Sequence, residues 1–113
     1  MKIINQTRNT LLADNATLAR TFLARIKGLL GKKGLKENHA LIIQPCNSIH
    51  TFFMRFVIDV IFLDKQHKVV GLRESMPPGR ISRIYPQAHT VVELPAHVIR
   101  STRTQIHDVL GIE

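Results

Sequence analysis

The chain has 113 residues, of which 44% are hydrophobic and 21% are charged, as is ordinary for a globular protein. This length fits one domain, spanning 1–113, whose core needs neither a disulfide nor a structural metal. The single cysteine, Cys46, excludes an intrachain disulfide. No segment resembles a signal peptide or approaches the roughly 18 apolar residues of a membrane span. We therefore expect a soluble cytoplasmic protein with no membrane partner.

Positive charge is concentrated near the N-terminus. The formal net charge is +8, and residues 1–36 hold eight of the 16 lysines and arginines against a single acid, Asp14. Lysines and arginines on one surface bind phosphates without reading a base sequence. One hypothesis is therefore polyanion or nucleic-acid binding through the basic residues Arg20, Arg25, Lys27, Lys32, Lys33 and Lys36. It is not the favoured one, because the chain has no known nucleic-acid-binding motif and no tryptophan for base stacking.

The first predicted elements are a hairpin and a helix. Residues 2–5 and 10–13 have the composition of two short strands joined by a polar turn. Apolar residues then recur at helical spacing and fall within an arc of about 140°. We predict an amphipathic helix over about 15–30 that packs on a sheet and is ended by Gly31 and Gly34.

The rest of the chain has the pattern of short strands. Residues 56–63 are apolar on both faces apart from one acid, which is typical of a central strand covered on both sides. Two adjacent prolines cannot lie in such a strand, so 75–80 is predicted as a loop. The other predicted elements are strands at 39–44, 68–73, 90–94 and 106–110 and a short helix near 96–103. The predicted fold class is α+β and predominantly β: a compact barrel-like or sandwich-like antiparallel or mixed sheet with the early helix packed on it.

Two acids lie in predicted strands. An ionised carboxylate at Asp59, inside the central strand, must be paired or hydrogen-bonded, or it takes up a proton. Asp59 is therefore either an acid that holds a neighbouring loop or strand through backbone amides, or an acid that works in a site. Glu93 raises the same question, although it could instead face solvent at the sheet edge.

Cys46 and His50 are separated by three residues, with His39 upstream. A tetrahedral zinc site needs four ligands, so neither a metal nor another cofactor is predicted. A nucleophilic cysteine needs a base, and His50 is the candidate near it in sequence. One hypothesis is therefore an enzyme that uses Cys46, His50 and Asp59, and the alternative interpretation of Cys46 is an inert, half-buried thiol.

Polar and aromatic residues are concentrated just before the predicted central strand. Such residues at a strand entrance can line a small pocket, in which Arg55 would suit an anionic group. The alternative is that Phe52 and Phe53 belong to the core and that Arg55 pairs with an acid. The pocket hypothesis assigns ligand binding to His50, Thr51, Met54, Arg55, Asp59 and Glu93.

Several stretches together resemble a known family. They read GLLG at 28–31, CNSIHTFFMRF at 46–56, IDVIFLD at 58–64 and VELPA at 92–96. In this order and spacing they resemble the family called domain of unknown function 192. The resemblance implies a compact, predominantly β fold with the early helix packed on it, and it implies no reaction and no catalytic residue.

Two positions depart from that family pattern. The family usually has glycine where this chain has His97 and His107. If those glycines have positive φ, a histidine in their place costs about 1 kcal/mol or more.

The preferred functional hypothesis is a small non-enzymatic binding or accessory domain. Its pocket, at the end of the sheet, would hold a small anionic ligand or a segment of a partner protein.

Overall fold

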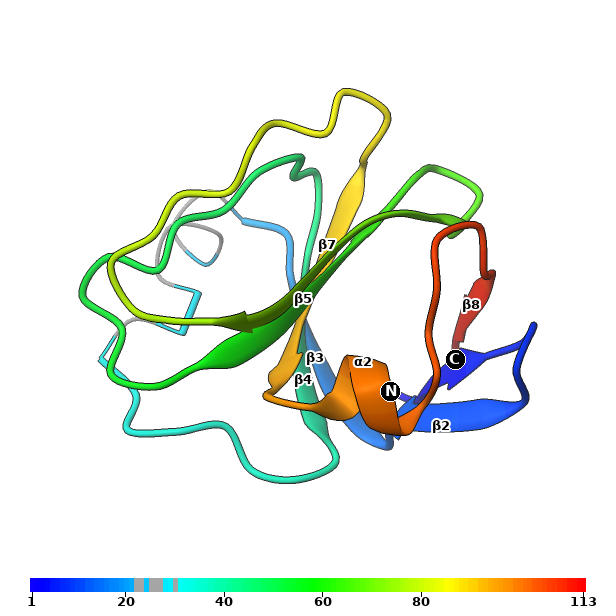
Figure 1. Ribbon diagram of the computed structural model, residues 1–113, viewed down its shortest axis with the longest axis horizontal. Helices are drawn as coiled ribbons and strands as arrows, with labels where there is room; N and C mark the ends of the chain where they lie inside the picture. The colour runs from blue at the N-terminus through cyan, green and yellow to red at the C-terminus, as the bar shows by residue number, and fades with distance from the viewer. Residues whose placement is uncertain (22–23, 25–27, 30) are drawn as a thin grey trace.

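The computed structural model describes residues 1–21, 24, 28–29 and 31–113, which form two β-sheets and one short helix (Figure 1). The strands are β1 (Ile3–Asn5), β2 (Thr10–Ala13), β3 (Asn15–Ala19), β4 (His39–Ile43), β5 (Ile58–Leu63), β6 (Val69–Met76), β7 (Thr90–Pro95) and β8 (Leu110–Ile112), and the helix is α2 (Val98–Ser101).

The larger sheet has five strands in the order β3-β4-β7-β5-β6. β5 pairs antiparallel with both β6 and β7, and all six of its residues are buried. This agrees with the run of residues that is apolar on both faces. At the edge of the sheet, β3 pairs parallel with β4.

The smaller sheet has three antiparallel strands in the order β2-β1-β8 and joins the two ends of the chain. Lys2 N donates to Glu113 O at 2.8 Å, and Glu113 N donates to Lys2 O at 2.9 Å. The termini therefore lie side by side, as Figure 1 shows.

The two faces of the larger sheet carry two separate hydrophobic clusters. The first cluster joins residues of both sheets, such as Ile3 and Ile61, with Ile99 of α2. The second lies on the opposite face, where side chains from the connecting loops, including Ile49 and Met54, pack against strand residues such as Val60. Adjacent residues of a strand point to opposite faces, so each central strand contributes to both clusters.

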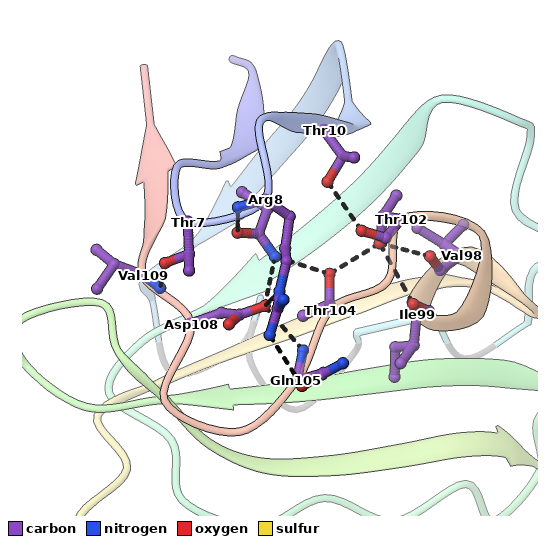
Figure 2. A network of polar contacts seen from close by, with 11 residues as sticks. Thr7, Arg8, Thr10, Val98, Ile99, Thr102, Thr104, Gln105, Asp108 and Val109 are labelled. Atoms are coloured by element: carbon purple, nitrogen blue, oxygen red, sulfur yellow. Dashed lines mark hydrogen bonds and ion pairs between the residues drawn. The ribbon is translucent and has the colours of Figure 1, made fainter.

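A polar network ties the C-terminal loop to the first hairpin (Figure 2). Asp108 Oδ2 accepts hydrogen bonds from Asn5 Nδ2 at 3.0 Å, Arg8 Nε at 3.1 Å and the Gln105 amide at 2.9 Å. Burial acts to raise the pKa of Asp108, but these three donors outweigh it and hold that pKa below its ordinary value. The buried carboxylate therefore works as a structural anion.

The mostly β fold, the first hairpin and the short helix in the region of 96–103 are confirmed. The predicted helix over 15–30 is wrong at its start, because residues 15–19 form β3. Backbone pairing with β4 has outweighed the local helical pattern there. Within the rest of the predicted helix, Ala24 is helical and residues 28–29 form a turn, while 22–23, 25–27 and 30 lie outside the described residues.

Three predicted boundaries also need correction. The central strand begins at Ile58 instead of 56, because the residues before it belong to a loop. β6 continues to Met76, into the segment predicted as a loop. The last strand is Leu110–Ile112 instead of 106–110, because Asp108 accepts from the Gln105 amide and closes a turn there. None of the helices in the described part of the chain is long and apolar enough to cross a membrane.

Candidate functional site

Two loops, which follow β4 and β6, are joined by backbone hydrogen bonds along part of their length. We call residues 47–57 and 77–86 the loop pair; the two segments run alongside one another at the left of Figure 1. Thr51 N donates to Arg80 O at 2.8 Å, and Ser82 N donates to Ile49 O at 2.9 Å. His50 and Ile81 face each other in an antiparallel bridge between these bonds. The loop pair is therefore a short two-stranded ribbon outside the main sheets.

The inner face of the loop pair is held by two buried hydroxyl groups. Thr51 Oγ1 donates to Pro77 O at 2.6 Å and accepts from Arg80 N at 2.9 Å. Ser82 Oγ accepts from Ile49 N at 2.9 Å and donates to Arg83 O at 2.9 Å. Thr51 is thus a structural residue of this ribbon.

The outer face of the loop pair carries exposed apolar and aromatic side chains. His50 and Ile81 lie on the same side because they are directly opposite each other in the ribbon. The His50 ring stacks on Phe52 with ring centroids 5.3 Å apart. Ile81 is 65% exposed and Ile84 is 62% exposed, so two large aliphatic side chains of this short ribbon face water.

Among the large apolar residues that the structure describes, Phe53 is the most exposed, at 87%. Met54 N donates to Thr51 O at 3.2 Å and closes a turn in which Phe53 is the third residue. The φ of Phe53 is 65°, in the left-handed region that favours glycine or asparagine and that a bulky residue rarely adopts. The chain therefore holds an aromatic ring in water on a strained backbone. The neighbouring Met54 points inward, into the second hydrophobic cluster.

The charge of the loop pair is entirely positive. Arg55, Arg80 and Arg83 are exposed, and neither loop contains an aspartate or a glutamate. The ion pairs between described residues are Arg8 with Asp108 and Arg100 with Glu74, so they involve none of these three arginines.

Asp59 does not belong to this surface. It is fully buried, and its two carboxylate oxygens accept from Ser75 N at 2.8 Å and from Ile99 N at 2.9 Å. The carboxylate thus joins β6 and α2 to the central strand through backbone amides. Those contacts match the structural interpretation of this acid.

Glu93 is also buried, but it has no comparable set of donors. Its Oε2 atom has no hydrogen-bond partner among the described residues, and burial raises its pKa to about 7. The two acids lie on adjacent strands, with Asp59 opposite Leu94 and Glu93 opposite Val60. Because neighbouring positions alternate between faces, the carboxyl groups of Asp59 and Glu93 lie on opposite sides of the sheet.

Each residue of the enzyme hypothesis contacts groups outside that set. Asp59 uses both oxygens on backbone amides, and His50 stacks on Phe52 on the outer face of the loop pair. Cys46 is half-buried, and its Sγ donates to Ser48 O at 3.0 Å. Within the described ranges, no group of three or more His, Cys, Asp or Glu residues is placed to hold a metal ion.

Two open hollows lie beside the loop pair and meet at Ala88. The smaller, about 190 Å³, is lined by Pro45, Cys46, Asn47 and Ala88. The larger, about 430 Å³, is lined by residues 64–66 and 86–89. Neither hollow is lined by His50, Thr51, Met54 or Arg55.

The basic N-terminal residues lie elsewhere on the chain. Arg20, Lys32, Lys33 and Lys36 are exposed, while Arg25 and Lys27 lie outside the described residues.

Sequence reasoning did not identify the second loop as part of the candidate site. Residues 80–84 read Arg-Ile-Ser-Arg-Ile, in which cations and large aliphatic residues surround one small polar residue. Pro77, Pro78 and Gly79 come directly before this segment and are typical of a loop, in which the isoleucines would be exposed. The predicted core role of Phe52 and Phe53 is wrong, since they are 39% and 87% exposed.

Two curated relatives match almost the whole chain. UPF0127 protein TK1120 of Thermococcus kodakarensis is 34% identical over 115 residues, which cover 96% of this chain and 71% of the relative. UPF0127 protein PH1112 of Pyrococcus horikoshii is 33% identical over 112 residues, covering 94% of each.

The fold is shared with a solved structure, and the family is shown by its sequence model. The crystal structure of a protein of unknown function from Novosphingobium aromaticivorans has a TM-score of 0.83 at 15% identity and covers 98% of this chain and 82% of that one. The model of domain of unknown function 192, described as "Uncharacterized ACR", matches residues 3–112. The sequence resemblance is thereby confirmed, and the chain belongs to the family of domain of unknown function 192.

Proposed function

We propose that this domain is a non-enzymatic binding module that holds a segment of another protein against the outer face of the loop pair. Aromatic residues and arginine are enriched in the centres of protein interfaces, where a few side chains supply most of the binding energy. The loop pair offers both kinds of residue on one ribbon, which hydrogen bonds already hold in shape. A preformed surface loses less conformational entropy when it binds.

Phe53 is the observation that carries this proposal. Phe53 is 87% exposed and has a φ of 65°, so the residue contributes little to the core and strains the backbone. A backbone outlier of this kind costs on the order of 1–3 kcal/mol and concentrates at functional sites. Glycine would suit the turn better, so the backbone does not explain the phenylalanine and the ring itself needs a role. We assign it the role of the anchor that enters a pocket on the partner.

The residues of the predicted pocket take different roles in this proposal. His50 and Arg55 join Phe52 and Phe53 as contact residues on the exposed surface. Thr51 and Met54 hold the ribbon from its inner side, where they are buried. A protruding surface favours an extended partner segment over an enclosed small ligand, because a small ligand needs a concavity to bury most of its surface.

The test is an unbiased selection of peptides of about a dozen residues from a random displayed library against the purified chain. The variant Phe53→Gly removes the ring and relieves the turn, so it should fold at least as stably as the parent chain. We expect selected peptides to bind Phe53→Gly at least about tenfold more weakly, the loss typical of an interface anchor.

The matched control is Leu11→Thr, which removes another exposed apolar side chain, 48% exposed on β2, and should leave the affinity unchanged. A selection that enriches no peptide would overturn the proposal. Peptides that bind the Phe53→Gly variant as tightly as the parent would overturn it as well.

A further inference from the structure

We infer that the partner segment is acidic, with carboxylates interspersed among apolar side chains. This inference rests on the proposed function of the loop pair and names the chemistry of its partner. It concerns the exposed arginines Arg55 and Arg83, which the strands and the two clusters do not use. Arg80, in contrast, lies opposite Thr51 in the ribbon and alternates away from the side of His50 and Ile81.

The cations of the loop pair are all arginines. The seven lysines of the chain all lie elsewhere, at Lys2, Lys27, Lys32, Lys33, Lys36, Lys65 and Lys68. Arginine presents a planar fork of donors that matches a carboxylate in two parallel hydrogen bonds, whereas lysine acts as a point charge. Neither loop contains an acid, and the ion pairs between described residues involve none of these arginines, so we assign their complementary carboxylates to the partner.

Arg83 is already held in place for such a contact. Its Cζ atom lies 5.1 Å from the centroid of the Tyr85 ring, within the range of a cation–π interaction. Tyr85 in turn packs on the buried Phe62 ring with centroids 4.1 Å apart. The guanidinium therefore loses little freedom when it binds an anion, and its forked donors remain available.

The same surface fits other polyanions less well. Single-stranded nucleic acid stacks its bases on aromatic rings, but Ile81 and Ile84, which make up much of the exposed apolar area, cannot stack. Anionic lipid attracts lysine and arginine alike, so it gives no reason for arginine alone. An acidic and apolar peptide uses both the arginine forks and the aliphatic side chains.

The test compares three synthetic peptides in which leucine and phenylalanine alternate with one variable residue. The first carries glutamate, the second has glutamine at those positions and the third has lysine. Binding to the purified chain is measured by fluorescence anisotropy. Separate measurements use phosphatidylserine-containing vesicles and an oligothymidylate.

We expect the glutamate peptide to bind at least about tenfold more tightly than the glutamine peptide, and the lysine peptide not to bind. Arg83→Gln should weaken binding of the glutamate peptide about tenfold. The control replaces Lys32 and Lys33 together by glutamine, which removes two exposed charges from the other basic region. It should change the affinity less than about twofold.

Equal binding of the glutamate and glutamine peptides would overturn the inference. The inference would also be overturned if the vesicles or the oligonucleotide bound more tightly than the glutamate peptide and Arg83→Gln abolished that binding. If library peptides without acids bind and lose affinity in Phe53→Gly, the inference fails while the proposed function stands. If no peptide of any charge binds, both fail.

Discussion

Replacing Glu93 by glutamine should change how the stability of the domain depends on pH. The carboxyl group is buried, its Oε2 atom has no partner among the described residues, and burial raises its pKa from 4.5 to about 7. Below pH 4.5 the group is protonated in both folded and unfolded chains. Between pH 4.5 and 7 only the unfolded chain ionises, so the free energy of unfolding falls as the pH rises. Above pH 7 the loss is complete.

The size of the effect follows from the shift in pKa. One unit of pKa corresponds to about 1.4 kcal/mol, so the rise from 4.5 to about 7 gives a loss of about 3 kcal/mol. Glutamine has no proton to lose and a similar shape, so Glu93→Gln should not show this loss. The variant should gain about 3 kcal/mol relative to the parent chain between pH 4.5 and pH 8. All other titrations are common to both proteins and cancel in the difference.

The measurement is urea unfolding followed by circular dichroism at intervals from pH 4.5 to pH 8, with the parent and the variant side by side. Glu37→Gln, which removes the charge of an exposed glutamate, is the control and should change the free energy of unfolding by less than about 0.5 kcal/mol. A Glu93→Gln difference that stays constant with pH would refute the reasoning. A difference that moves in the opposite direction would show that the ionised carboxylate has a stabilising partner.

Two further predictions concern the strained backbone at His97 and the buried acid Asp59 of β5. His97→Gly should raise the free energy of unfolding by about 0.5–1 kcal/mol. His97 has φ 79°, and glycine adopts this conformation without strain, although the greater conformational entropy of glycine in the unfolded chain offsets part of the gain. Thermal unfolding checks this, with His97→Ala, which retains the strain, as the comparison. Asp59→Asn should lower the free energy of unfolding by about 1–3 kcal/mol, because the amide keeps one acceptor and leaves one buried backbone N–H without a partner. Urea unfolding measures the loss, and an unchanged midpoint would show that neither bond contributes.

The fold could be predicted where the pattern of apolar residues has a single interpretation. The hairpin at the N-terminus and the central strand follow from alternation and from an apolar run, and both are found as β1, β2 and β5. The helix over 15–30 could not be placed correctly, because its first residues pair with β4, which lies about twenty residues further along the chain. A long-range partner of this kind is not visible in local periodicity.

At two positions the sequence indicates backbone conformation through the family pattern and not through periodicity. The family pattern has glycine where this chain has His97 and His107, and these residues have φ 79° and 78°. The condition stated for the two family glycines, a positive φ, is therefore met at both histidines. At Phe53, with φ 65°, the chain gives no such signal, because an aromatic residue argues against positive φ.

The candidate site could be predicted only in part. The polar and aromatic stretch before β5 drew attention to His50 and Arg55, which are exposed on the loop pair. The second loop, with Ile81 and Arg83, was missed because hydrogen bonds between distant segments bring it there. Which side chains of a loop point outward depends on the register of those bonds.

The scaffold differs from the surface that we propose for binding in whether its polar and apolar side chains have partners within the domain. Asp59 and Asp108 are buried and accept two and three hydrogen bonds respectively, so these side chains serve the fold. On the loop pair the opposite holds. Phe53 is in water on a strained turn, and Arg83 packs on the Tyr85 ring but forms no ion pair with any carboxylate that the structure describes. Interactions within the domain do not account for these groups, because relaxing the turn or exchanging the arginine would leave the core intact. A partner that supplies an apolar pocket and carboxylates would account for both.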